Sequence, residues 1–207
     1  MTLKQTVLSL AFGLITVHVS GQALMDYFLP DSTKNKASFY TPDKNGLRSS
    51  ITRTIYYINK GGEYEIIDSQ SLKGQPSAIQ TTTVKFVDNE VRMIKAVSTT
   101  MLEKNKKSDF NPHRVIFKMP PSGKTVSWTF VNVSGDNITC TASWTTVSID
   151  GSPQPAIQVV KQYEGFSSKI IEYYVKGFGL WKTDMEEAAG RAQPSEIFDG
   201  LSYEADR

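Results

Sequence analysis

Apolar and polar residues alternate with a period of two over most of this chain. In the stretch Thr125–Val133, Val126 and Trp128 fall on one face of an extended strand, and hydroxyl-bearing residues fall on the other. The stretch Ile138–Asp150 alternates in the same way, with threonines opposite its apolar row. This pattern is typical of half-buried strands in an antiparallel sheet that has one packed face and one wet face.

Residues that favour tight reversals separate these stretches. Lys60-Gly61-Gly62 and Asp88-Asn89 are two such separators, because the turns of hairpins often need a positive φ, which Gly, Asn and Asp tolerate. The predicted strands are Ala37–Thr41, Ile51–Asn59, Glu63–Leu72, Ile79–Val87, Glu90–Met101, His113–Met119, Thr125–Val133, Ile138–Asp150, Pro155–Tyr163, Ser168–Val175 and Leu180–Asp184. Short links between successive strands predict an antiparallel meander of about ten strands.

A mainly β chain of this kind must hide its apolar face. A single meander can do so by closing into a barrel or by curving into a half-barrel. A Greek-key sandwich is less favoured, because it needs long crossover connections that the chain lacks. After Asp184, the segment Met185–Ala192 contains good helix formers, so we expect a short C-terminal helix or flexible tail over residues 185–207. The predicted organisation is one β domain over residues 24–184.

The first 23 residues have the three parts of a secretory signal peptide. Lys4 gives a positive start, Val7–Val19 is an apolar run, and small residues end the segment at Ala23. The run is shorter than the roughly 20 apolar residues of a membrane span, and no second long run follows. The sequence therefore predicts an exported protein, periplasmic or extracellular, that is soluble after cleavage near Ala23 and has no transmembrane span in the mature chain.

Charge and cysteine content limit the kinds of partner and attachment that the sequence allows. The chain has 23 Lys and Arg against 21 Asp and Glu, scattered along its length, so no nucleic-acid partner is expected. The single cysteine, Cys140, lies in phase with Ile138 and Ala142, which predicts a buried apolar role. It cannot anchor a lipid, because lipoprotein maturation needs a cysteine directly after the signal peptide, where this chain has Leu24.

Catalytic chemistry is hard to assemble from this sequence. Past the signal peptide, His113 is the only histidine, at the start of a predicted strand. A Ser-His-Asp or Cys-His arrangement needs a histidine, and one histidine with one cysteine cannot form a structural zinc site. We therefore expect no cofactor and no metal. An enzyme that uses carboxylates alone stays open, because a sequence does not show whether two carboxylates face each other in a cleft.

Aromatic residues are the most suggestive group. Most fall in predicted strands at the period expected of core positions. The alternative interpretation is an apolar cavity or groove, as in barrels that enclose a ligand. The candidate ligand-binding residues are Trp128, Phe130, Trp144, Tyr174, Phe178 and Trp181.

Two segments resemble known proteins. The segment Glu172–Lys182 (EYYVKGFGLWK) resembles the closing hairpin of small secreted bacterial proteins of uncharacterised function, and Tyr27-Phe28-Leu29-Pro30 resembles the opening of their mature chains. Those proteins are similar in outline to the lipoprotein-carrier (LolA/LolB-like) architecture, so the resemblance implies a curved antiparallel sheet around an apolar cavity. The matching motifs are structural and carry no catalytic residue. Apart from the resemblance, Gly177 and Gly179 would let a strand bend sharply or let an aromatic ring cover the backbone.

Two functions from different classes fit these observations. The first is an exported, non-enzymatic binding protein whose curved sheet accepts a hydrophobic or lipid-like ligand. The second is an interaction module with a solid core, which uses outward tyrosines and an edge strand to join an envelope protein partner. Empty interior volume separates them, because a carrier needs a connected apolar cavity and a packed module has none.

Overall fold

The computed structural model describes residues 19–100, 106–109, 113–131, 135–187 and 192–204. One helix and thirteen strands follow one another along these residues. The elements are α1 (Val19–Phe28), β1 (Lys36–Pro42), β2 (Arg48–Asn59), β3 (Glu63–Leu72), β4 (Gln75–Val87), β5 (Glu90–Thr100), β6 (Lys106–Asp109), β7 (Arg114–Lys118), β8 (Val126–Val131), β9 (Asn137–Ile149), β10 (Ser152–Tyr163), β11 (Lys169–Val175), β12 (Gly179–Glu186) and β13 (Ala192–Ser202).

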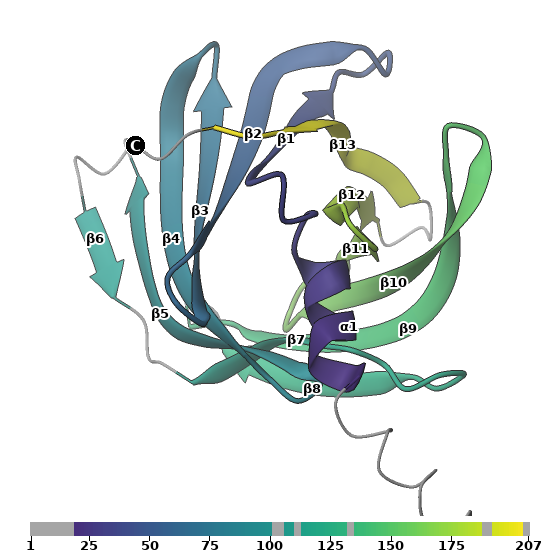
Figure 1. Ribbon diagram of the computed structural model, residues 1–207. Helices are drawn as coiled ribbons and strands as arrows, with labels where there is room; N and C mark the ends of the chain where they lie inside the picture. Colours follow the sequence, from purple (N-terminus) through teal and green to yellow (C-terminus); the bar gives the residue numbers. More distant parts are fainter. Residues whose placement is uncertain (1–18, 101–105, 110–112, 132–134, 188–191, 205–207) are drawn as a thin grey trace, which may run out of the picture.

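All of the strands belong to one antiparallel sheet, which curls into a nearly closed barrel (Figure 1). The strand order is β6-β5-β4-β3-β2-β1-β13-β12-β11-β10-β9-β8, and β7 pairs with β5. Neighbours in the sheet are neighbours in the sequence except where β13 pairs with β1 and where β7 pairs with β5. The predicted fold class, a mainly β chain whose single antiparallel meander forms a curved half-barrel or a barrel, is confirmed, and the sheet takes the nearly closed form.

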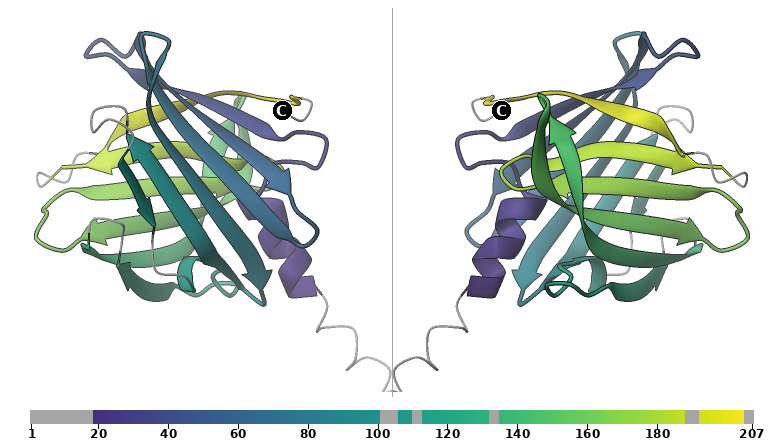
Figure 2. Two further views of the ribbon diagram at one scale, coloured as in Figure 1. Left: turned by 90° about the vertical axis from the view of Figure 1, so that its left-hand side faces the viewer. Right: turned by 90° about the vertical axis from the view of Figure 1, so that its right-hand side faces the viewer.

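The strand pattern of the sequence carries over to the sheet. In β8, Trp128 is buried, while Ser127 and Thr129 on the other face are exposed. Cys140 is also buried, as its phase with Ile138 and Ala142 predicted. Figure 2 shows that β2 to β5 run at a steep angle to β10 to β13, so the barrel is formed by two strongly twisted halves of one sheet.

The C-terminal segment differs from the prediction. We expected a short helix or tail over residues 185–207, but Met185 and Glu186 continue β12 and Ala192–Ser202 forms β13. The strand β13 pairs with both β12 and β1. The helix propensity of a two-turn segment contributes little free energy. The backbone hydrogen bonds available from two neighbouring strands contribute more, so the segment forms a strand. Residues 188–191, within the predicted helix, lie outside the described residues.

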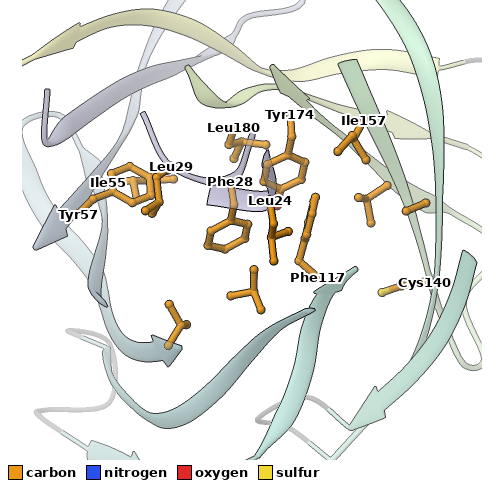
Figure 3. Packing of buried hydrophobic residues seen from close by; sticks show 14 of the residues in the cluster. Leu24, Phe28, Leu29, Ile55, Tyr57, Phe117, Cys140, Ile157, Tyr174 and Leu180 are labelled. Atoms are coloured by element: carbon orange, nitrogen blue, oxygen red, sulfur yellow. The ribbon is translucent and has the colours of Figure 1, made fainter. Parts of the chain in front are cut away.

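The helix α1 lies inside the barrel (Figure 1). Leu24 and Phe28, one helical turn apart, face the same side and are buried in the main core cluster. Figure 3 shows these two side chains among inward residues of the sheet, including Phe117 and Tyr174. The helix ends where Pro30 follows Leu29, because a proline disfavours helical backbone in the residue before it.

The strand turn between β11 and β12 holds the end of α1 in place. The Gly177 amide donates to the Asp26 carbonyl at 2.7 Å, and the Asp31 amide donates to the Gly177 carbonyl at 2.8 Å. Gly179 has φ +70°, and a Cβ at this position would lie 3.1 Å from the Phe28 carbonyl oxygen. Gly179 thus allows the backbone of α1, rather than an aromatic ring, to approach the strand closely.

The predicted signal peptide and α1 overlap. Residues 1–18, which hold most of its apolar run, lie outside the described residues. Val19–Ala23 form the first part of α1, and Leu24, the residue after the predicted cut, has no solvent exposure. Cleavage after Ala23 stays a prediction, and it would leave the core residues of α1 in the mature chain.

Candidate ligand sites in the barrel

Four of the six candidate ligand-binding residues lie together in the main core cluster. Trp128 and Tyr174 are buried in it, and Phe130 and Trp144 pack against it. The Tyr174 ring lies 4.7 Å from the Phe117 ring and is stacked on Phe28 at 5.8 Å. Because these rings contact one another and α1, the protein itself fills this apolar part of the interior.

The other two candidates lie apart from these four. Phe178 and Trp181 pack in a smaller cluster with Ile149, Ala156 and Val175. Their rings are 5.2 Å apart. The six residues therefore do not form one continuous lining, and a ligand role for them stays a prediction.

A cleft of about 560 Å³ opens beside the end of α1. We call it the mouth cleft. Its walls come from α1 and the segment after it, from the β2–β3 hairpin, from the β11–β12 turn and from Tyr203 after β13. The lining residues are Met25, Asp26, Leu29, Pro30, Asp31, Ser32, Lys34, Asn35, Tyr57, Ile58, Asn59, Tyr64, Lys176, Gly177 and Tyr203. None of the six candidate residues is among them. The two segments that carry the resemblance do meet at the mouth cleft, since Leu29 and Pro30 of one and Lys176 and Gly177 of the other line it.

The lining of the mouth cleft is amphipathic. Met25 and Leu29 give it an apolar wall, and Tyr64 adds an aromatic one. Charged groups stand beside this wall: the Lys176 Nζ lies 3.3 Å from the Asp26 Oδ2. Both members of this ion pair are partly exposed, so the pair adds little to stability, but it puts both signs of charge beside an apolar surface.

A second candidate site lies farther along the inner face of the sheet. Charged and polar side chains there continue the inward parity of the apolar rows: Arg53 precedes Ile55 and Tyr57 by two and four positions on β2, and Glu172 precedes Tyr174 on β11. We call this set the polar belt. Its members are Lys161, Glu172, Thr183, Glu196, Arg53, Asp68 and Gln80.

Strand register and ion pairs together connect the members of the polar belt. Glu172 lies directly opposite Thr183, which lies directly opposite Glu196. On the other side of the barrel, Asp68 lies directly opposite Gln80. Directly opposite residues of antiparallel strands put their side chains on the same face, so the belt runs around the inside of the barrel from β10 to β4.

Arg53 is the centre of one half of the belt. Its Nε and Nη2 donate to the two carboxylate oxygens of Asp68 at 2.9 and 2.6 Å, and its Nη1 donates to the Glu196 Oε2 at 2.5 Å. This is a bidentate pair with a second carboxylate added. Burial alone would lower the pKa of Arg53, but the two carboxylates hold it well above its usual value.

Glu172 is the centre of the other half. The Lys161 Nζ donates to its Oε1 at 2.5 Å, and the Tyr174 hydroxyl donates to its Oε2 at 2.7 Å. Burial alone would raise the pKa of Glu172, but the ammonium of Lys161 and the Tyr174 hydroxyl hold it below its usual value. The positive charge of Arg53, in the other half of the belt, also lowers the pKa of Glu172.

Tyr57 connects the two candidate sites. It lines the mouth cleft and is two residues beyond Ile55 on the inward face of β2. Burial raises the pKa of its hydroxyl, and the charges of Arg53, Asp68 and Glu172 also act on it. Tyr57 therefore belongs to the wall of the mouth cleft and lies within reach of the belt charges.

His113 and Cys140 take no part in either site. His113 is exposed and has a left-handed backbone with φ 79°. Burial raises the pKa of the Cys140 thiol to about 12, so it is not a reactive thiolate at neutral pH. Within the described ranges, no group of three or more His, Cys, Asp or Glu side chains could hold a metal ion.

The sequence contained a signal for the polar belt. Charged residues extend the apolar rows with the same parity, as in Arg53-x-Ile55-x-Tyr57 and Glu172-x-Tyr174. A charged residue two positions from an inward apolar residue lies on the same, inward face of the strand. A charged residue on the solvent face lies instead at the positions between the inward ones. The mouth cleft has no comparable signal, because its walls come from four separate parts of the chain.

Comparisons with known proteins show weak structural similarity. No family model matches the chain, and no curated protein matches it in sequence. The fold is similar to a candidate lipoprotein from Parabacteroides distasonis ATCC 8503, with 10% identity and a TM-score of 0.46, over 86% of this chain and 99% of that one. It is also similar to a candidate exported protein with a YmcC-like fold from Bacteroides fragilis NCTC 9343, with 9% identity and a TM-score of 0.46, over 86% and 99% of the two chains. Neither is described as a lipoprotein carrier, so the resemblance to that architecture stays a prediction.

Among the residues that the structure describes, no helix is both long and apolar enough to cross a membrane.

Proposed function

We propose that this protein is an exported, non-enzymatic binding protein that takes a small amphipathic ligand in the mouth cleft. The observation that carries the proposal is the cleft itself, whose volume of about 560 Å³ falls within the range of small-molecule sites. A ligand with an apolar body would contact Met25, Leu29 and Tyr64. Its polar end would lie beside the charges of Asp26 and Lys176.

The filled interior supports the cleft over the enclosed cavity that the sequence led us to expect. Leu24 and Phe28 occupy the middle of the apolar half of the barrel (Figure 3). A lipid-like ligand in that place would have to displace α1. The mouth cleft offers an apolar wall without that rearrangement.

A fluorescent fatty acid tests the proposal by titration. Ile58→Asp puts a carboxylate into the cleft wall and should weaken binding at least about tenfold, because the ligand's apolar part would then desolvate a charge. Ile51→Asp is the matched control: it is the same change on the same strand, at an isoleucine that is 43% exposed and does not line the cleft. Equal binding by the Ile58→Asp protein and its parent would refute the cleft as the site.

Export is tested separately by the intact mass of the protein recovered from its own cell envelope. The expected mass is that of a chain that has lost residues 1–23. Native mass spectrometry of the same sample would detect a ligand that co-purifies. A chain that still carries Met1 in the cytoplasmic fraction would overturn the export proposal.

The interaction module remains a second candidate, because one surface observation favours it. Ile51 and Leu72 lie directly opposite each other on β2 and β3, and both are exposed, as is Leu47 on the β1–β2 turn. Neighbouring exposed apolar side chains of this kind mark contact surfaces. If this candidate is right, Leu72→Asp abolishes binding to an envelope partner, and the protein takes up no fatty acid.

A further inference from the structure

Exposed apolar side chains gather at one end of the barrel. Of the seven large apolar residues that are exposed in the described part of the chain, three are Leu47, Ile51 and Leu72. Leu47 lies on the β1–β2 turn, and Ile51 and Leu72 lie directly opposite each other, near the start of β2 and at the end of β3. Single exposed apolar residues are ordinary, but a group of them marks a contact surface. We call residues 43–51 and 72–75 the hairpin tip.

The two turns of the hairpin tip project from the same end of the sheet. Successive antiparallel strands reverse direction, so the β1–β2 and β3–β4 turns lie at one end and the β2–β3 turn lies at the other. Figure 2 shows the first two turns together at the top of the molecule and the start of α1 at the bottom. The mouth cleft is lined by Ile58 and Asn59, beside the β2–β3 turn, so the hairpin tip and the cleft lie at opposite ends of β2.

Hydrogen bonds fix the shape of the hairpin tip. The Asp43 Oδ1 accepts from the Asn45 and Leu47 amides, both at 2.8 Å, and the Asp43 amide donates to the Leu47 carbonyl at 2.7 Å. The Lys73 amide donates to the Ser50 carbonyl at 3.0 Å, which ties the β3–β4 turn to β2. The tip therefore presents its apolar side chains on ordered turns, and a partner does not have to order them on binding.

Positive charge lies beside these apolar side chains. The hairpin tip has three cations, Lys44, Arg48 and Lys73, and one carboxylate, Asp43. Arg48 pairs with Asp199 at 2.7 Å, and the Asp43 carboxylate accepts from the amides of its own turn. Among the described residues, Lys44 and Lys73 are exposed and form no ion pair. Two ammonium groups without a carboxylate thus stand beside exposed apolar surface.

This combination restricts the partner. The core of a protein–protein interface is depleted of lysine, because burying an ammonium without a partner is costly. At an anionic membrane, lysines stay in water and are attracted to the lipid headgroups, while apolar side chains enter the layer beneath the headgroups. The charges of the hairpin tip therefore complement an anionic lipid surface better than a buried protein interface.

We propose that the hairpin tip docks this protein on the surface of an anionic lipid bilayer. Its three exposed apolar side chains enter the interfacial layer, and the ammonium groups of Lys44 and Lys73 contact the headgroups. This goes beyond the ligand function proposed for the mouth cleft, whose lining shares no residue with the tip. Because the cleft lies at the other end of β2, docking leaves it open to water.

Co-sedimentation with lipid vesicles tests the proposal. The protein recovered from the cell envelope is mixed with vesicles of phosphatidylglycerol and phosphatidylcholine in equal parts, or of phosphatidylcholine alone. We expect at least about tenfold stronger binding to the anionic vesicles. Raising NaCl from about 0.1 M to about 0.5 M should weaken that binding, because salt screens the attraction. Parent and variants share one N-terminus, so their differences report the hairpin tip alone.

The apolar part of the surface is tested with Leu47→Asp. This change should weaken binding to the anionic vesicles at least about tenfold, because the headgroups repel a carboxylate and the interfacial layer does not solvate it. Phe166→Asp is the matched control, since it also replaces an exposed apolar side chain with a carboxylate, in the β10–β11 turn. The control should bind vesicles as the parent does. Both positions are exposed, so neither change should unfold the protein.

The charged part is tested with the double variant Lys44→Gln, Lys73→Gln. Removing the two ammonium groups should weaken binding to the anionic vesicles about tenfold or more. The control is Lys60→Gln, Lys124→Gln, which removes the same charge at two exposed lysines outside the hairpin tip. It should bind more tightly than the first double variant.

Several outcomes would overturn the proposal: no binding to either kind of vesicle, equal binding to both, Leu47→Asp binding that matches the parent, or equal binding by the two double lysine variants. An envelope protein that binds the tip while vesicles do not would assign the surface to a protein partner instead. The mouth cleft is judged separately. Leu47→Asp should bind the fatty acid as the parent does, and Ile58→Asp should bind vesicles as the parent does, so each proposal can fail alone.

Discussion

The two halves of the barrel interior are built from the same strands but are completed in different ways. Around α1, inward positions such as Val84, Val91 and Phe117 are apolar and are covered by the helix. Along the polar belt, inward positions of the same sheet carry Arg53 and Glu172, which are held by ion pairs and keep part of their solvent exposure. One half of the barrel interior is an apolar core, and the other is a network of paired charges.

This difference shows what α1 contributes. A barrel of this many strands does not close on its own side chains alone, since wide barrels enclose space that something else must fill. Here the helix α1 packs into the apolar part, and charged side chains that pair with one another occupy the polar part. Substitutions at Phe28, Lys161, Gly179 and Thr183 test this difference between the two halves.

Removing the ring of Phe28 should have the largest effect. Phe28 is 8% exposed and contacts Phe86, Phe117 and Tyr174, so Phe28→Ala should lower the free energy of unfolding by about 3–5 kcal/mol. Urea unfolding measures this. Phe166→Ala, at a phenylalanine that is 62% exposed, should lose less than about 0.5 kcal/mol. A Phe28→Ala protein as stable as the control would mean that α1 does not complete the core.

Breaking the belt ion pair should have the next largest effect. Lys161→Met leaves the Glu172 carboxylate buried without its cation, and we expect a loss of about 2–3 kcal/mol at neutral pH. Adding Glu172→Gln should restore at least half of that loss, because the neutral amide keeps the shape and can still accept from the Tyr174 hydroxyl. If the double variant is less stable than Lys161→Met alone, the two side chains are not coupled as the structure indicates.

The same pair gives a pH dependence with a definite sign. The pKa of Glu172 is lower in the folded protein than its ordinary value of 4.5, so the unfolded chain binds the proton more tightly. The stabilisation is therefore present above pH 4.5 and is lost as the pH falls through the lower, folded pKa. Thermal unfolding between neutral and acidic pH should show this loss in the parent. The Lys161→Met protein, in which burial raises the pKa of Glu172, should show less of it.

Gly179→Ala tests how closely α1 is held against the sheet. We expect a loss of about 1–2 kcal/mol, because the position has φ +70° and the new Cβ would meet the Phe28 carbonyl oxygen at 3.1 Å. Gly177→Ala has a similar φ of +78° but nothing within 4 Å of the new Cβ, so it should lose only the conformational part. Equal losses in the two variants, measured by urea unfolding, would show that the close approach of α1 adds no constraint.

The sequence predicted the sheet well because period-two alternation is a local property of each strand. The strand Glu63–Leu72 was predicted with the boundaries that β3 has. The strand β13 was missed because Ala192–Ser202 lacks clean alternation, and it forms only because β1 and β12 stand on either side of it. Such pairing depends on residues more than 150 positions away along the chain, as between Lys36 and Ser202.

The sites were harder to predict than the strands. The six aromatic candidates were chosen for their residue type. Whether an inward aromatic ring is packed or accessible to a ligand depends on where α1 lies in the barrel, and the strand pattern does not contain that information. The sequence assigned Val19–Ala23, the first half of α1, to a signal peptide and so predicted no helix inside the barrel. The belt could have been predicted from the parity of Arg53 and Glu172, whereas the ion pairs themselves need the barrel to close.

Thr183→Val should change the free energy of unfolding least of the four substitutions. The direction of that change shows whether the Thr183 hydroxyl has a hydrogen-bond partner in the folded protein. The Thr183 hydroxyl is buried with no partner among the described residues, so replacing it with a methyl group should leave the free energy of unfolding unchanged or raise it by up to about 1 kcal/mol. Thr82→Val is the matched control, since the Thr82 hydroxyl accepts from the Gln80 Nε2 at 3.1 Å and its loss should cost about 1 kcal/mol. Both are measured by urea unfolding. If Thr183→Val destabilises as much as Thr82→Val, the Thr183 hydroxyl is already satisfied in the protein. A gain in stability is the behaviour expected of a buried hydroxyl that the fold leaves without a partner, because the methyl group removes the cost of its desolvation.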